Sequence, residues 1–139
     1  MRALRLLLPM IAATLGCTEL PSGLARFQGT FSYMASDQIG RPAFGGTFSL
    51  VVHADSTITG MHTLVGYRIA GGAPTVVGRV RGDSIFLWLD PNPDAGIIIN
   101  AGARADGFSG TWAYNTIGGP LPGGSLFAQR TNDPLPTAP

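Results

Sequence analysis

The feature that most constrains the fold of this chain is a turn signal that occurs three times. Each copy places a basic or imidazole residue, a small residue, an aspartate and a small residue between two runs that favour extended backbone. The copies are residues 53–56, 81–84 and 104–107. Aspartate bonds backbone amides two residues further on, and glycine adopts the positive φ of a hairpin turn. The repeated signal therefore predicts three tight β-hairpins.

Strand candidates flank these turns, and further ones lie at either end of the domain. The expected strands are 25–34, 47–52, 57–65, 75–80, 85–89, 97–103, 108–114 and 125–130. Twenty glycines and eleven prolines favour short strands with many turns, and no stretch after residue 17 keeps a helical period. The prediction is all-β: a single up-and-down antiparallel meander, closed into a small eight-stranded barrel because closure removes exposed edges. A two-sheet β-sandwich is the alternative, since strand number alone does not separate the two.

The first seventeen residues have the three-part order of a bacterial export signal. Arg2 and Arg5 precede an apolar run over residues 6–15, and a glycine and a cysteine follow it. As a helix this run reaches about 15 Å, half of the roughly 30 Å hydrocarbon core of a bilayer. It is therefore expected to direct export and not to remain as a membrane span.

Residues 14–17, Thr-Leu-Gly-Cys, resemble the lipobox of bacterial lipoproteins. Gly16 and Cys17 match that motif, whereas Thr14 stands where leucine is usual and Leu15 where a small residue is usual. The resemblance implies that Cys17 is diacylated and becomes the first residue after cleavage, which anchors the protein to a membrane. The alternative is an ordinary signal peptide that ends near an incidental cysteine. Cys17 is the only cysteine, so no disulfide forms within the chain.

The expected domain order is simple. Residues 1–16 are the signal peptide, 17–23 the lipidated cysteine and a tether, 24–130 the barrel, and 131–139 a disordered proline-rich tail. Two of the nine basic residues leave with the signal, so seven remain against eight acids. The mature part has no basic stripe of the kind that binds nucleic acid, and we expect no nucleic-acid partner.

A rhythm of glycine, threonine and an aromatic residue, or of a turn, a strand and a glycine, occurs at 29–31, 56–60, 108–112 and 124–128. It resembles the small meander barrels of the calycin type, of which the avidin-like proteins are nearest in size. The resemblance implies an eight-stranded barrel. The aspartate that avidins place near the last strand for biotin has no equivalent before Arg130, so no biotin site is implied.

Two motifs suggest chemistry and are better explained as turns. Residues 82–85, Gly-Asp-Ser-Ile, match a serine-hydrolase signature, but Ser84 lies in a predicted hairpin and no histidine base follows His62. Residues 90–96 place oxygen ligands like the start of an EF-hand loop, but position twelve is Ala101 where a bidentate glutamate is required. His53 and His62 have no evident third ligand for zinc. We expect no catalytic residue, no metal and no cofactor.

Aromatic side chains gather on two of the predicted strands. Phe86 and Trp88 share one face of their strand, and Trp112 and Tyr114 share one face of another. A ring-rich surface in so small a barrel is first of all core, and if a ligand pocket exists these four rings are its expected walls. Two arginines, at positions 79 and 81, point the same way along a strand and are interpreted as a solvated outer face, with an acidic partner as the alternative.

The function expected from the sequence is binding at the cell envelope. The protein is predicted to be exported, lipid-anchored through Cys17 to the outer membrane or periplasmic face, and non-enzymatic, and to bind a small apolar ligand or an envelope protein. The alternatives are a module that inhibits proteases or assists envelope assembly and, less favoured, a hydrolase. A cavity lined by Trp88 or Trp112 would favour a ligand, whereas a filled core with an exposed apolar patch would favour a protein interface.

Overall fold

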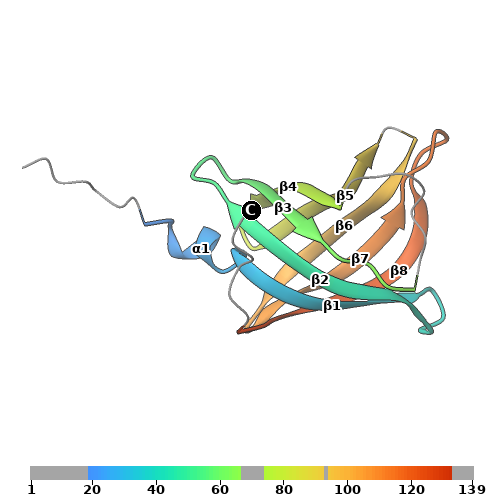
Figure 1. The fold of residues 1–139 in the computed structure, drawn as a ribbon, viewed down its shortest axis with the longest axis horizontal. Helices are drawn as coiled ribbons and strands as arrows, with labels where there is room; N and C mark the ends of the chain where they lie inside the picture. The colour runs from blue at the N-terminus through green and yellow to red at the C-terminus, as the bar shows by residue number, and fades with distance from the viewer. Residues whose placement is uncertain (1–18, 67–73, 93, 133–139) are drawn as a thin grey trace, which may run out of the picture.

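The computed structural model describes residues 19–66, 74–92 and 94–132, which form a closed antiparallel barrel (Figure 1). Each strand pairs with the next along the chain, and the last pairs with the first. The strands are β1 (Gly29–Asp37), β2 (Pro42–Val52), β3 (Thr57–His62), β4 (Thr75–Arg81), β5 (Ser84–Asn92), β6 (Ala95–Arg104), β7 (Gly107–Tyr114) and β8 (Leu121–Arg130). The predicted up-and-down meander is confirmed, and the closed order excludes the sandwich. Cys17, the signal and residues 133–139 lie outside the described residues.

The three repeated turn signals form the three predicted hairpins. Val52 pairs with Ile58 across the first, Arg81 with Ser84 across the second, and β6 with β7 across the third. Ser56 and Gly82 adopt positive φ, of 69° and 56°, as such tight turns require. All three hairpins lie at the end of the barrel where β1 begins. We call this the near end, and the opposite end, where the β1–β2 and β7–β8 connections lie, the far end (Figure 1).

The barrel interior is a packed core. Strand alternation turns apolar side chains inward, and four phenylalanines are fully buried: Phe27, Phe31, Phe48 and Phe108. The ring centroids of Phe31 and Phe108 lie 5.1 Å apart, and Tyr33 stacks on Phe48 at 4.0 Å. Rings from β1, β2 and β7 therefore meet across the barrel and fill it between the two ends.

A single helical turn, α1 (Ser22–Ala25), precedes the barrel at its near end. No pattern in the sequence predicted this turn, and residues 17–23 were expected to be a tether. Arg26 holds the segment in place, because it forms an ion pair with Asp83 and donates to the carbonyl of Gly82. Arg130 donates to the carbonyls of Gln28 at 2.6 Å and Arg26 at 2.7 Å. The chain before β1 is thus fastened across the near end.

Several segments that were predicted as loops belong to strands, as β1 continues to Asp37 and β2 begins at Pro42. β5 continues through Pro91 to Asn92, and β8 begins at Leu121. The extensions of β5 and β8 contain an irregular register: one between Leu89 and Asn92 in the pairing of β5 with β6, and one opposite the Trp112–Ala113 step of β7. Such bulges bend a strand and redirect its side chains, and both of these bulges lie at the far end. Within the described residues no helix has the length and apolar character to cross a membrane.

Candidate functional site

The structure divides the four predicted pocket aromatics between the two faces of the barrel wall. Phe86 and Trp88 lie on the outer face of β5, where Phe86 is 38% exposed, because their neighbours Ile85, Leu87 and Leu89 point inward. Trp112 and Tyr114 are partly buried and pack against the core. The four rings therefore do not line one common pocket.

Trp112 lines a pocket at the far end of the barrel. The pocket has a volume of about 700 Å³ and lies between the β1–β2 turn, β7 and the start of β8. Its lining residues are Asp37, Gln38, Gly40, Thr111, Trp112, Ala113, Pro120, Pro122, Gly123, Gly124 and Ser125. We call it the Trp112 pocket.

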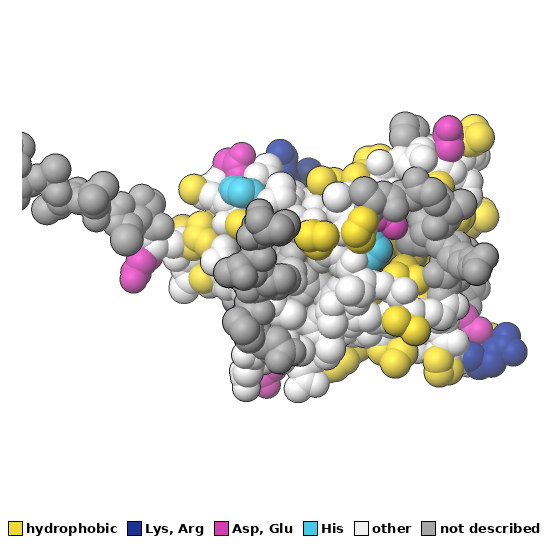
Figure 2. All heavy atoms as spheres, viewed as in Figure 1, with side chains coloured by type: hydrophobic (Ala, Val, Ile, Leu, Met, Phe, Trp, Pro, Cys, Tyr) yellow, Lys and Arg dark blue, Asp and Glu magenta, His cyan; other side chains and the backbone are white. Residues whose placement is uncertain are grey.

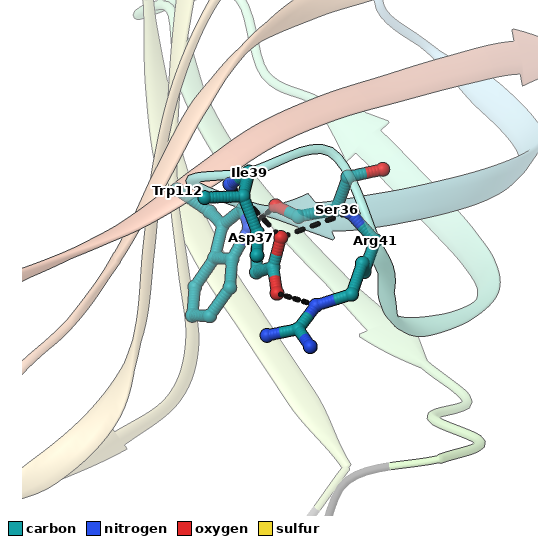
Figure 3. Close-up of polar contacts among 5 residues, drawn as sticks. All are labelled: Ser36, Asp37, Ile39, Arg41 and Trp112. Atoms are coloured by element: carbon teal, nitrogen blue, oxygen red, sulfur yellow. Dashed lines mark hydrogen bonds and ion pairs between the residues drawn. The ribbon is translucent and has the colours of Figure 1, made fainter.

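The indole of Trp112 is fixed by contacts on several sides. Its Nε1 donates to the carbonyl oxygen of Ser36 at 2.9 Å, and its ring meets the ring of Phe44 edge to face, with centroids 4.9 Å apart. The ring also lies directly against Gly123, where a Cβ atom would overlap it. Figure 3 shows the indole beside the β1–β2 turn. A large apolar ring is therefore held in one orientation at the pocket, and its N–H group already has a hydrogen-bond partner in Ser36.

The β1–β2 turn gives the pocket a charged rim. Asp37 Oδ1 accepts from the backbone amides of Arg41 at 2.8 Å and Ile39 at 3.0 Å, and Oδ2 accepts from the Arg41 side chain at 3.1 Å (Figure 3). The amide of Arg41 is the main cause that holds the pKa of Asp37 below its ordinary value, so this carboxylate is charged at neutral pH. Gln38 ties the turn to β8, because its Nε2 donates to the carbonyl of Pro122 at 2.8 Å.

A second polar feature of the far end lies inside the barrel. Nε2 of His62 and Oδ1 of Asp90 are 3.0 Å apart, and the two side chains are only 3% and 7% exposed. Asp90 has a φ of +47°, which is uncommon for a residue other than glycine. His62 ends β3, and Asp90 lies in the irregular part of β5. A strained backbone thus places a carboxylate beside a histidine in an apolar core.

The surroundings of this pair leave one atom without a partner. Nδ1 of His62 is buried and forms no hydrogen bond with any described residue. The hydroxyl of Tyr33 donates to the carbonyl of Thr63 at 2.9 Å. Burial raises the pKa of Tyr33, and the negative charge of Asp90 raises it further. The sequence did not predict this pair. Its one visible signal was that alternation along the strand turns His62 toward the inside of the barrel.

The remaining sequence candidates do not come together. His53 is exposed in the turn between β2 and β3, where its Nε2 is hydrogen-bonded to the hydroxyl of Thr59 at 2.8 Å, whereas His62 lies at the opposite end of β3. Ser84 begins β5 at the near end, whereas His62 lies at the far end and the Nε2 of His53 is bonded to Thr59, so the structure joins neither histidine to the serine as a base. Over residues 19–66, 74–92 and 94–132 no three histidine, cysteine, aspartate or glutamate side chains gather as a metal site would require.

Comparisons of the chain with protein-family models, with curated proteins and with solved structures found no match. The likeness to calycin-type barrels therefore extends to the closed eight-stranded architecture alone.

Proposed function

We propose that this protein is an exported, lipid-anchored envelope protein whose barrel binds a small apolar ligand at the Trp112 pocket. The observation that carries the ligand proposal is the fixed indole of Trp112 in a pocket of about 700 Å³. Ligand sites are usually hollows of roughly 300–1,000 Å³ with aromatic walls and a few polar groups that orient the ligand. Asp37 and Gln38 supply such groups at the rim. The proposed role is binding and not catalysis.

The proposed anchor and the Trp112 pocket lie at opposite ends of the barrel. The chain enters the barrel through α1 at the near end, whereas the Trp112 pocket lies at the far end (Figure 1). A lipid on Cys17 would therefore attach the protein to a bilayer by the near end. The pocket would then face away from the membrane, where a ligand in the surrounding aqueous space can reach it.

A protein interface is the second candidate, and one observation favours it. Met34 on β1 and Phe127 on β8 lie directly opposite each other and are 55% and 48% exposed. Figure 2 shows further hydrophobic side chains at the surface of one face of the barrel. Contiguous exposed apolar side chains are a feature of contact surfaces, and these two lie side by side on neighbouring strands. The double variant Met34→Ser/Phe127→Ser would weaken a protein partner and leave a ligand in the Trp112 pocket unaffected.

The ligand proposal is tested with N-phenyl-1-naphthylamine, an uncharged apolar probe whose fluorescence rises when it leaves water. We expect saturable binding that Thr111→Phe weakens by about tenfold, because Thr111 is exposed and its side chain can fill the pocket from outside the core. Ser32→Phe adds the same ring at an exposed position of β1 that does not line the pocket, and is the control. Equal probe binding in both variants would rule out this pocket.

The anchor proposal is tested by growing cells with labelled palmitate. The wild-type protein should carry the label and sediment with membranes, whereas Cys17→Ala should lose the label and become soluble. A mature wild-type protein without lipid would overturn the anchor while leaving the ligand proposal intact.

A further inference from the structure

A second hollow lies on the outer face of β4, β5 and β6, away from the Trp112 pocket. It has a volume of about 570 Å³, and its lining includes Arg79, Arg81, Ser84, Phe86, Asn100 and Gly102. None of these residues lines the Trp112 pocket. We call this hollow the arginine groove.

The sheet register explains the shape of the groove. Arg79 pairs with Phe86, and Phe86 pairs with Asn100. Two residues closer to the near end, Arg81 pairs with Ser84, and Ser84 pairs with Gly102. Gly102 has no side chain on this face, and no atom lies within 4 Å of the place where its Cβ would stand. The absence of a side chain at position 102 therefore leaves this part of the hollow open.

The charge of the groove is not balanced by neighbouring acids. Arg79 and Arg81 are two residues apart on one strand face, so their Cα atoms are separated by about 6.6 Å. Within the part of the chain that the structure describes, neither guanidinium forms a hydrogen bond or an ion pair. The other described arginines all have partners, as Arg26 has Asp83 and Arg41 has Asp37. Two like charges thus stand side by side without a counter-charge.

An apolar ring stands next to these charges. Phe86 is 38% exposed and lies directly across from Arg79, with the amide of Asn100 on its other side. Guanidinium groups bind carboxylate, sulfonate and phosphate oxygens through charge-assisted hydrogen bonds, and an aromatic face binds an apolar body. A solvated outer face explains the two arginines, but it does not explain why an exposed ring and a hollow of about 570 Å³ lie beside them.

We propose that the arginine groove binds an organic anion. Its acidic head would lie between Arg79 and Arg81, and its apolar body would cover Phe86 and enter the space above Gly102. The proposal does not depend on the Trp112 pocket, because the two sites share no residue.

The test compares two probes that differ in one charged group. The full-length protein is titrated with 8-anilinonaphthalene-1-sulfonate and with its uncharged counterpart, N-phenyl-1-naphthylamine. We expect Gly102→Val to weaken the sulfonate probe by at least about tenfold, because the valine side chain would occupy the part of the hollow that Gly102 leaves open, where an added Cβ meets no other atom within 4 Å. The double variant Arg79→Gln/Arg81→Gln should weaken it similarly and should abolish the dependence of its affinity on salt.

Two control variants make the outcome decisive. Arg41→Gln removes one positive charge at the far end, and Thr111→Phe fills the Trp112 pocket, and both should leave the affinity for the sulfonate probe within about twofold of wild type. If Gly102→Val and the double arginine variant bind the sulfonate probe as wild type does, the arginine groove is not its site. If Thr111→Phe alone abolishes binding, the anion occupies the Trp112 pocket and this proposal fails while the Trp112 proposal stands.

Discussion

His62 and Asp90 meet inside the barrel, with Nε2 and Oδ1 3.0 Å apart, although the strands that carry them are separated by β4. Leu89 points inward, so regular alternation would turn Asp90 to the outside. The left-handed backbone of Asp90 and the register shift between Leu89 and Asn92 reverse that direction. His62 and Asp90 therefore meet because β5 departs from regular strand geometry at Asp90.

The first prediction concerns what Asp90 contributes to stability. Asp90→Ala leaves His62 buried without a partner and should lower the free energy of unfolding by about 3 kcal/mol. Asp90→Asn should lower it by only about 1 kcal/mol, because asparagine tolerates positive φ and offers an oxygen in the same place. Urea denaturation of the two variants measures the difference. Equal losses in both variants would show that the contact with His62 is not what stabilises this region.

The second prediction concerns stability at alkaline pH. Burial, and then the charge of Asp90, raise the pKa of Tyr33 above its ordinary value of about 10. Below pH 10 the tyrosine is protonated in both states, so its contribution to stability is constant. Above pH 10 the unfolded chain releases this proton and the folded barrel keeps it. The free energy of unfolding should then fall by up to about 1.4 kcal/mol per pH unit.

The variant Tyr33→Phe isolates this effect. It should lose about 1 kcal/mol at neutral pH, because the hydrogen bond to the carbonyl of Thr63 is gone. It should also lack the part of the alkaline slope that Tyr33 causes, so wild type and variant converge between about pH 10 and 11.5. Parallel denaturation curves across that interval would mean that Tyr33 ionises as readily in the folded barrel as in the unfolded chain.

The third prediction compares two glycines on paired strands. A Cβ at Gly110 on β7 would overlap the carbonyl oxygen of Asn100, whereas a Cβ at Gly102 on β6 would meet nothing. Gly110→Ala should therefore cost about 2 kcal/mol or more, since the backbones of β6 and β7 must separate. Gly102→Ala should be neutral or stabilising by up to about 1 kcal/mol, because glycine is a poor strand residue. Thermal unfolding of the two variants gives the comparison, and a stable Gly110→Ala would contradict the close approach.

Local sequence chemistry was sufficient for most of the strand order. Turn residues and alternation predict the three near-end hairpins, because those turns depend on residues that are adjacent in the chain. The far end depends on distant contacts. Gly123 and Gly124 look like loop residues in sequence, yet they belong to β8, and Gly123 leaves room for the ring of Trp112. Helix α1 is only one turn long and is too short to show a helical period.

The same distinction applies to the candidate sites. Phe86, Trp88, Trp112 and Tyr114 could be recognised as ring-rich strand faces, but alternation alone does not say which face of a closed barrel is the inner one. Only the register shows Phe86 outside beside Arg79 and places Trp112 against β1 and β8. Asp90 could not be foreseen at the core, because its direction depends on a bulge that forms against β6.

The last prediction concerns the closure of the near end by Arg130. Its Nη1 and Nη2 donate to the carbonyls of Gln28 and Arg26, and its guanidinium lies 4.8 Å from the centre of the Phe31 ring. Lysine keeps the charge but has no planar fork that reaches two carbonyls together. Arg130→Lys should therefore speed amide hydrogen exchange in residues 24–28 by about tenfold, equivalent to a loss of about 1.4 kcal/mol in local stability.

Arg104→Lys is the matched control for this variant. Arg104 lies over the ring of Phe127 at 5.8 Å and donates to the hydroxyl of Ser109, but it does not fasten the segment that precedes β1. Exchange in residues 24–28 should stay at the wild-type rate in Arg104→Lys, and exchange in β3 should stay unchanged in both variants. Wild-type exchange at 24–28 in Arg130→Lys would mean that Arg26 and its contacts with Gly82 and Asp83 close the near end without help from Arg130.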